Sequence, residues 1–250
     1  MKEQYVGDIG DFGKALILKH LAGLGFKIGI NWVLTENDHR ADGKHRDYVG
    51  YTGRDCLCCC DEKIFTQILP LARKERADRK IGDLESRIRS FCESVAFYSG
   101  KYVGGDARKT SEQEAFSKLS SHIADLVFFD PDNGVAGEYG NSSKHVYLSD
   151  LERYWKRGQS LLTYHHLARN GTHDAQVDNI KADFQSALPD GCVYTYHLRR
   201  GAARVYILCV REEHLPIVLG KESIPAILPL RTTKGKWTKL GKNCARSHSV

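Results

Sequence analysis

Two acidic residues in the segment Asp130-Pro131-Asp132-Asn133 have the types and the spacing to do chemistry. They follow the apolar run 126–129, which is typical of a buried strand that proline ends because it cannot donate to the ladder. In open α/β sheets, ligands bind outside the carboxyl ends of the strands, where a carboxylate can accept a hydrogen bond or hold a cation. An ordinary polar turn is the alternative, since Asp, Pro, Asn and Gly all favour turns. We expect a functional site here.

A second polar segment follows the strand expected at 160–164, so it should lie on the same rim. It contains Tyr164, His165, His166 and Arg169. Histidine can carry a proton near neutral pH, and arginine can bind a phosphate or a carboxylate. A loop of solvated or structurally bonded histidines is an equal alternative. The glycine-rich, basic segment 104–109 is expected to be a surface turn, with contact to a phosphate as its alternative.

The elements that position these residues alternate along the chain. Helical spacing of apolar residues is found at 11–24, 61–76, 79–92, 111–123, 149–156 and 173–187, and strand-like runs at 27–34, 95–98, 126–129 and 160–164. The chain then gives two strands, 192–198 and 204–210, joined by a short turn that predicts an antiparallel hairpin. This order predicts an α/β fold, with a mostly parallel central sheet, helices on both faces and a C-terminal antiparallel hairpin.

Composition favours one domain over residues 1–230, with a helical insertion near 56–95. The formal net charge is +6, and the acid-free segment 231–250 is a basic tail that contains Trp237. This tail could bind a phosphate backbone, or it could simply be solvated. No apolar run is long enough for a membrane span, so we expect a cytoplasmic protein with no membrane partner. The cysteines at 56 and 58–60 lack a second ligand pair, so we predict no metal site from them.

Two segments of the sequence resemble a known family. The segment Phe129–Asn133 looks like the Asp-Pro-Pro-Tyr motif of amino-group methyltransferases acting on adenine. The opening Gly7–Lys14 is similar to the Gly-Asn-x-x-Asp-x-x-Lys opening of the bacterial ribosomal RNA large-subunit adenine methyltransferases. The resemblance spans residues 5–212 and includes the order of the elements. It implies a Rossmann-like methyltransferase fold, in which a terminal hairpin closes the sheet.

The resemblance also implies a cofactor, a substrate and roles for individual residues. S-adenosylmethionine would be held by the opening and by the polar loop after the first strand, which supply Gly7, Asp8, Asp11, Lys14, Glu36, Asp38 and Gly43. The segment 130–133 would be catalytic: Asp130 and the Pro131 carbonyl would accept hydrogen bonds from the target amine and aim its lone pair at the methyl group. The partner would be RNA or DNA, with the 164–169 segment contacting the substrate.

Two other readings stay open. The carboxylates of Asp130 and Asp132, with Asp8, Asp11 and Asp38, could hold magnesium or manganese in a nuclease or another phosphoryl-transfer enzyme. A methyltransferase-like binding module without catalysis is the third reading. The cofactor loop has a single glycine, Gly43, where Gly-x-Gly is usual, and Asn133 stands where the family has an aromatic residue. Binding of the cofactor separates the first and third readings, and metal dependence separates the second.

Overall fold

The computed structural model describes residues 1–38, 61–121, 124–198, 203–219 and 239–243. Its central sheet has seven strands in the order β2-β1-β3-β6-β8-β7-β9. The strands β2, β1, β3 and β6 are parallel, whereas β8 is antiparallel to β6 and to β7, and β9 is antiparallel to β7. Their bounds are β1 Ile28–Asn31, β2 Val95–Tyr98, β3 Leu126–Phe129, β6 Ser160–His166, β7 Cys192–Leu198, β8 Arg204–Val210 and β9 Lys239–Asn243. The expected α/β class and terminal hairpin are confirmed.

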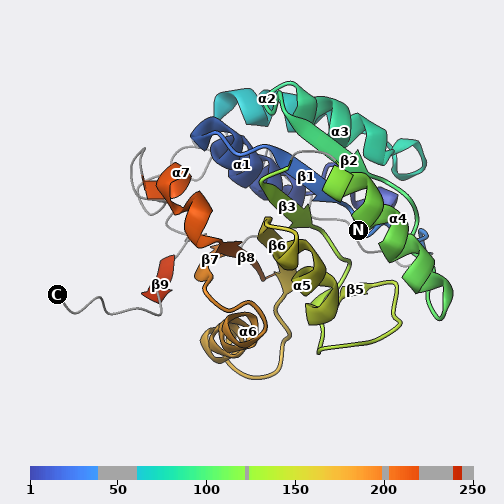
Figure 1. The fold of residues 1–250 in the computed structure, drawn as a ribbon. Coiled ribbons are helices and arrows are strands. Elements are labelled where there is room, and N and C mark those ends of the chain that lie inside the picture. The colour runs from blue at the N-terminus through green and yellow to red at the C-terminus, as the bar shows by residue number, and fades with distance from the viewer. Residues whose placement is uncertain (39–60, 122–123, 199–202, 220–238, 244–250) are drawn as a thin grey trace.

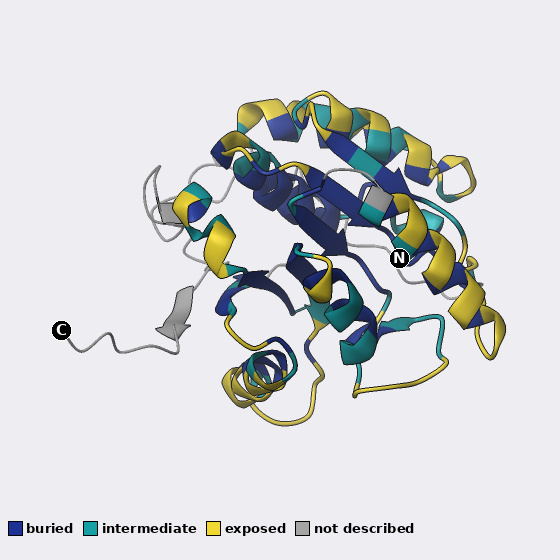
Figure 2. Cartoon of the chain, viewed as in Figure 1, coloured by how far each residue is buried: buried dark blue, intermediate teal, exposed yellow. Residues whose placement is uncertain are grey.

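Helices cover both faces of this sheet (Figure 1). One apolar core joins the sheet to α1 (Ile9–Leu24), α2 (Glu62–Ala72) and α3 (Ile81–Arg89). A second core joins the opposite face to α4 (Ala107–Ser121), α5 (Leu148–Lys156) and α6 (His173–Ala187). Figure 2 shows the strands between these layers as almost wholly buried. The continuous apolar runs of β1 and β3 follow from this arrangement, since both faces of a parallel sheet are covered.

Several elements differ from the sequence-based expectation. The strand β6 continues to His166, because its pairing with β8 extends to His166 opposite Arg204. A small parallel pair, β4 (Gly134–Val135) and β5 (His145–Val146), follows the Asp-Pro segment. Five residues of the basic tail form β9 at the sheet edge, and the rest of the tail, including Trp237, lies outside the described residues.

The connection between β1 and β2 carries helices. It contains α2, the 3-10 turn Arg76–Asp78 and α3, while residues 56–60 lie outside the described ranges. A short 3-10 turn, Glu212–His214, and α7 (Leu215–Leu219) follow β8. Across the described ranges, every helix is too short or too polar to cross a lipid bilayer.

The chain reverses its direction of travel across the sheet between β1 and β3. From β1 it moves outward to β2 and then returns to β3 on the other side of β1. The carboxyl ends of two adjacent strands with such a reversal leave a crevice where α/β proteins bind their ligands. Asn31 and Phe129 pair at these ends, and Asp130 follows directly. The fold therefore puts the Asp-Pro segment at the topological switch point.

Candidate functional site

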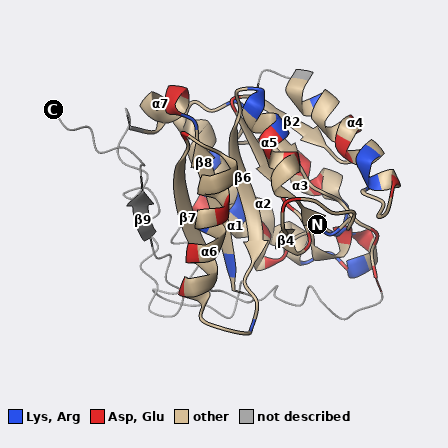
Figure 3. Cartoon of the chain, turned by 60° about the horizontal axis from the view of Figure 1, so that its bottom comes forward, with Lys and Arg blue, Asp and Glu red and all other residues tan. Residues whose placement is uncertain are grey.

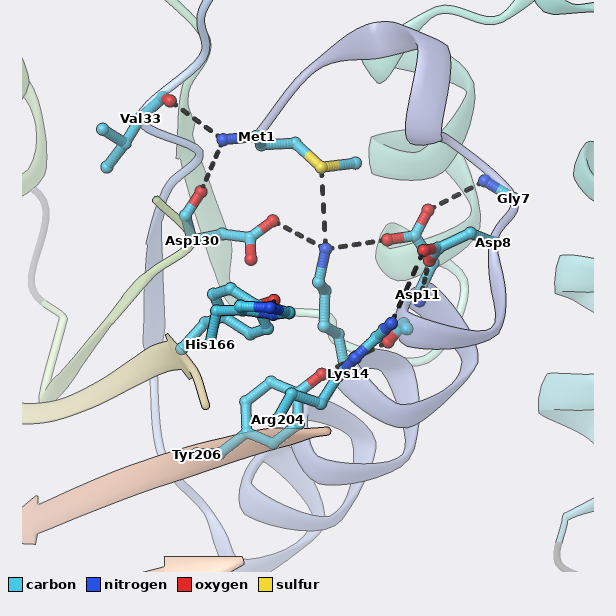
Figure 4. Close-up of polar contacts among 12 residues, drawn as sticks. Met1, Gly7, Asp8, Asp11, Lys14, Val33, Asp130, His166, Arg204 and Tyr206 are labelled. Carbon is cyan, nitrogen blue, oxygen red and sulfur yellow. Dashed lines mark hydrogen bonds and ion pairs between the residues drawn. The ribbon is translucent and has the colours of Figure 1, made fainter. Parts of the chain in front are cut away.

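Lys14 lies between two buried carboxylates at this switch point. Its Nζ is 2.7 Å from Oδ2 of Asp130 and 2.9 Å from Oδ1 of Asp11 (Figure 4). All three side chains are buried. The third neighbour of the ammonium is Sδ of Met1 at 3.6 Å, and a thioether is a weak acceptor. The opening motif and the Asp-Pro motif, 116 residues apart, are thus in direct contact.

Burial and charge act on this cluster in opposite directions. Burial lowers the pKa of Lys14, but the carboxylates of Asp11 and Asp130 outweigh it and hold that pKa well above its ordinary value. Burial raises the pKa of Asp11 to about 6, against the opposing effect of the Lys14 ammonium. Lys14 is therefore a fixed positive charge, while the Asp11 carboxyl group binds a proton more readily than an ordinary aspartate.

The opening motif is built by the start of α1. Asp8 caps this helix, because its side chain accepts a hydrogen bond from the Asp11 N–H at 3.1 Å. Asp11 in turn accepts one from the Gly7 N–H at 2.8 Å. Gly7 has a φ of +85° and packs against the backbone of α2, where a side chain has no room. The helix begins at Ile9, two residues before the start expected at residue 11, so Asp11 lies in its first turn and projects into the site.

The first residues of the chain lie on the same rim. The Met1 amine donates to the Val33 carbonyl at 3.1 Å and to the Asp130 carbonyl at 2.9 Å. Burial lowers the pKa of this amine to about 6. Lys2 bridges Asp38 and Asp132, at 2.7 and 3.0 Å. Figure 3 shows acidic and basic residues side by side around the N-terminus. Asp38 and Asp132 thus lie close together, because both carboxylates bind the Lys2 ammonium.

Beyond Asp130, the Asp-Pro segment runs from the core to the surface. Pro131 is buried and Asn133 is exposed, with its N–H bonded to the Lys144 carbonyl at 2.9 Å. Gly134 has a φ of +107°, and a Cβ there would meet His165. Nδ1 of His165 accepts a hydrogen bond from the Val135 N–H at 3.2 Å. Burial lowers the pKa of His165 to about 4, so it is a neutral ring that braces this turn.

The other predicted substrate residues spread along the end of β6. Tyr164 is half-buried and packs edge-on against Tyr206, with ring centroids 5.9 Å apart. His166 is exposed, and so is Arg169 beyond it. Burial lowers the pKa of His166, and the nearby Arg204 and Arg169 lower it further. This end of β6 is therefore a half-buried aromatic surface, with the charge of Arg169 at its outer side.

Two of the predicted cofactor residues are not in the central cluster. Glu36 is exposed and pairs with Lys101 at 2.7 Å. Gly43 lies outside the described residues. Asp38 is within the site, but Lys2 and the Gln4 amide bind its carboxylate. Of the predicted loop residues that the structure describes, Asp38 therefore lies at the site and Glu36 does not.

Arg108, in the segment predicted to be a surface turn, is buried. Its guanidinium binds both carboxylate oxygens of Asp150, at 3.1 and 2.5 Å. The neighbouring Glu112 accepts a hydrogen bond from Tyr102, and burial raises its pKa to about 8. Both Arg108 and Glu112 belong to α4, which begins four residues before the helix expected at 111–123. The surface-turn prediction was wrong for Arg108, which instead joins α4 to α5.

Sequence reasoning also missed Lys2 and Arg204. Arg204 begins β8 and shares a sheet face with Tyr206 and the apolar residues beyond it. A charged residue on the buried face of an alternating strand is a signal that the sequence offers. No comparable signal marks Lys2, because a lysine near a chain terminus is ordinary.

Within the described residues, no three His, Cys, Asp or Glu side chains are grouped closely enough to hold a metal ion. The metal-dependent reading therefore has no ligand set in that part of the chain. Scans against protein-family models, curated proteins and solved structures each found no match for this chain.

Proposed function

We propose that this chain is an S-adenosylmethionine-dependent methyltransferase with a Rossmann-like methyltransferase fold, acting on an amino group of a nucleic-acid base. The observation that carries the proposal is the contact between Lys14 and Asp130 at the switch point. The resemblance assigns one residue to the cofactor and the other to the target amine. A transfer reaction needs those two ligands side by side, and the 2.7 Å contact meets that condition.

The charges around the switch point suit this cofactor, which carries a sulfonium and an ammonium group. Carboxylates outnumber side-chain cations here: Asp8, Asp11, Asp38, Asp130 and Asp132 against Lys2, Lys14 and Arg204. A cationic ligand would offset this excess, which is otherwise unfavourable in a partly buried place. An acceptor group of the same ligand would replace the Met1 sulfur as the third neighbour of Lys14. The cofactor supplies an electrophilic methyl group when bound.

The chain itself would position the target amine. Lys14 binds Oδ2 of Asp130, which leaves Oδ1 for a hydrogen bond from the amine. The Pro131 carbonyl would be the second acceptor. The neighbouring carbonyls of Val33 and Asp130 already accept hydrogen bonds from an amine, that of Met1. A base within a duplex would have to leave the stack to reach this depth. The half-buried ring of Tyr164 would then serve as the stacking surface, in place of the aromatic residue that the family has at the position of Asn133.

A methyl-transfer assay with two matched substitutions tests the proposal. The test substitution is Asp130→Asn, directly after the carboxyl end of β3. The control is Asp125→Asn, directly before the amino end of the same strand. With labelled cofactor and mixed cellular RNA or denatured DNA, we expect incorporation to fall by about 10²–10³-fold in the first variant, because the amine loses a charged acceptor. We expect Asp125→Asn to keep wild-type transfer. Full transfer by folded Asp130→Asn would refute the role of this carboxylate.

A further inference from the structure

Arg204 is a buried cation with few polar contacts to the described residues. Only 5% of its surface is exposed. Its nearest carboxylate is Asp8, at 3.9 Å from Nη2, and its Nε–H makes no hydrogen bond within the described part of the chain. A buried guanidinium normally binds partners with most of its five donors, because an unsatisfied buried donor is costly. Arg204 therefore has donors to spare for a ligand.

The guanidinium lies beside the Lys14 cluster and against the first turn of α1 (Figure 4). A Cβ at Gly10 would overlap with Nη1 of Arg204, so a glycine at this position makes room for the guanidinium. The first N–H groups of a helix have no acceptor inside the helix and attract anions. Arg204 thus lies at this helix end, where the Asp8 carboxylate caps the Asp11 N–H.

A histidine and a second arginine continue from Arg204 towards solvent. Arg204 is the register partner of His166, which is exposed at the end of β6. Arg169 follows, also exposed, and its charge acts on His166 together with that of Arg204. The sequence of groups runs from a buried guanidinium to an exposed one along a single edge of the sheet.

We infer that Arg204 binds a phosphate of the nucleic-acid strand next to the target nucleotide. This inference rests on the proposed function. A planar guanidinium matches two phosphate oxygens at once, and a strand that enters the site must carry a phosphate on each side of the extruded base. The exposed Arg169 would meet the strand further out. Phosphate contacts of this kind fix the register of the strand rather than its sequence.

Fluorescence anisotropy of a labelled single-stranded oligonucleotide of mixed sequence, measured with the full chain over a series of salt concentrations, tests this inference. Arg204→Met should weaken binding at low salt at least tenfold and reduce the slope of log K against log salt by about 0.7–1, which corresponds to one phosphate contact. Arg204→Lys keeps the charge but loses the planar guanidinium that can bind two phosphate oxygens, so its affinity should lie between those of the wild type and Arg204→Met. Arg153→Met removes an arginine of α5 whose guanidinium stacks on Phe116, and should match the wild type.

The thermal stability of the same variants separates a ligand-binding role from a structural one. Because the contacts of Arg204 to the described residues are so few, Arg204→Met should melt no lower than the wild type. A structural arginine would give a clear fall in Tm. If Arg204→Met fails to fold, Gly10→Ala carries the test together with Arg204→Lys, since the added methyl group displaces the guanidinium without changing the charge.

Unchanged affinity and salt slope in folded Arg204→Met would overturn the inference and leave the methyl-transfer proposal standing. Failure of the wild type to bind the oligonucleotide would overturn it as well, and calorimetry with the cofactor would then show whether the transferase itself survives. A loss of affinity for S-adenosylhomocysteine with oligonucleotide binding intact would mean that Arg204 holds the cofactor carboxylate, and the phosphate assignment would fall.

Discussion

At the residue scale, the centre of the site is one lysine shared by two buried carboxylates. Sequence analysis identified these residues separately: Lys14 and Asp11 through the opening motif, and Asp130 as an acidic residue that follows a buried strand. Their mutual contact was not predictable, because spacing along the chain places residues on an edge of a sheet but says nothing of which side chains touch across it. Arg204 and Lys2 escaped prediction for the same reason, since their roles come only from long-range neighbours.

Replacing Lys14 with methionine should destabilise the protein strongly. Asp11 and Asp130 would keep their burial and lose their cation, and breaking a buried pair in this way costs about 3–5 kcal/mol. Lys19→Met on the same helix is the control, because the Lys19–Asp61 pair is partly exposed and should be worth about 1 kcal/mol or less. Urea unfolding at pH 8 measures both.

The loss in Lys14→Met should shrink as the pH falls. The pKa of Asp11 is already raised to about 6 in the wild type, and without the ammonium it would rise further. The folded variant therefore binds a proton more readily than its unfolded chain, and its stability falls as the pH rises. A difference from wild type that is equally large at pH 5 and pH 8 would show that the carboxylates are not the source of the loss.

At the element scale, the strands with two covered faces were the easiest to predict. The bounds of β2, β3, β7 and β8 match the expected ones, because continuous apolar runs and a short turn mark them clearly. The end of β6 and the β4–β5 pair were missed. The end of β6 consists of the polar residues Tyr164, His165 and His166, whose strand conformation comes from pairing with β8. The β4–β5 pair is only two residues long on each side, too short for an alternating pattern to mark it.

Substitution of Gly134 with alanine should loosen the turn after the Asp-Pro segment. A Cβ there combines a φ of +107° with overlap on His165, so we expect a loss of about 1–3 kcal/mol. Gly158→Ala is the matched control, because Gly158 has a φ of +94° and open space around its Cβ position. The difference between the two in thermal unfolding isolates the overlap. Equal losses would mean that His165 does not brace this turn.

At the scale of the whole molecule, the order of the strands assembles the site. The reversal between β1 and β3 creates the topological switch point, α1 brings Lys14 to it, and the β6–β8 pair brings Arg204. The α/β class and the rim that carries chemistry could be predicted from the alternation of elements. The excess of carboxylates at that rim could not, because it results from segments as distant as Asp8, Asp38 and Asp132.

Calorimetric titration of the full chain with S-adenosylmethionine and S-adenosylhomocysteine tests the central claim most directly. ATP, which shares the adenosine but lacks the amino-acid part, is the control ligand. We predict saturable binding of both methionine-derived ligands with one site per chain, weak or no binding of ATP, and loss of binding in Lys14→Met under conditions where circular dichroism shows that variant folded. Absence of binding by the wild type at millimolar ligand, or equal binding by folded Lys14→Met, would contradict the account.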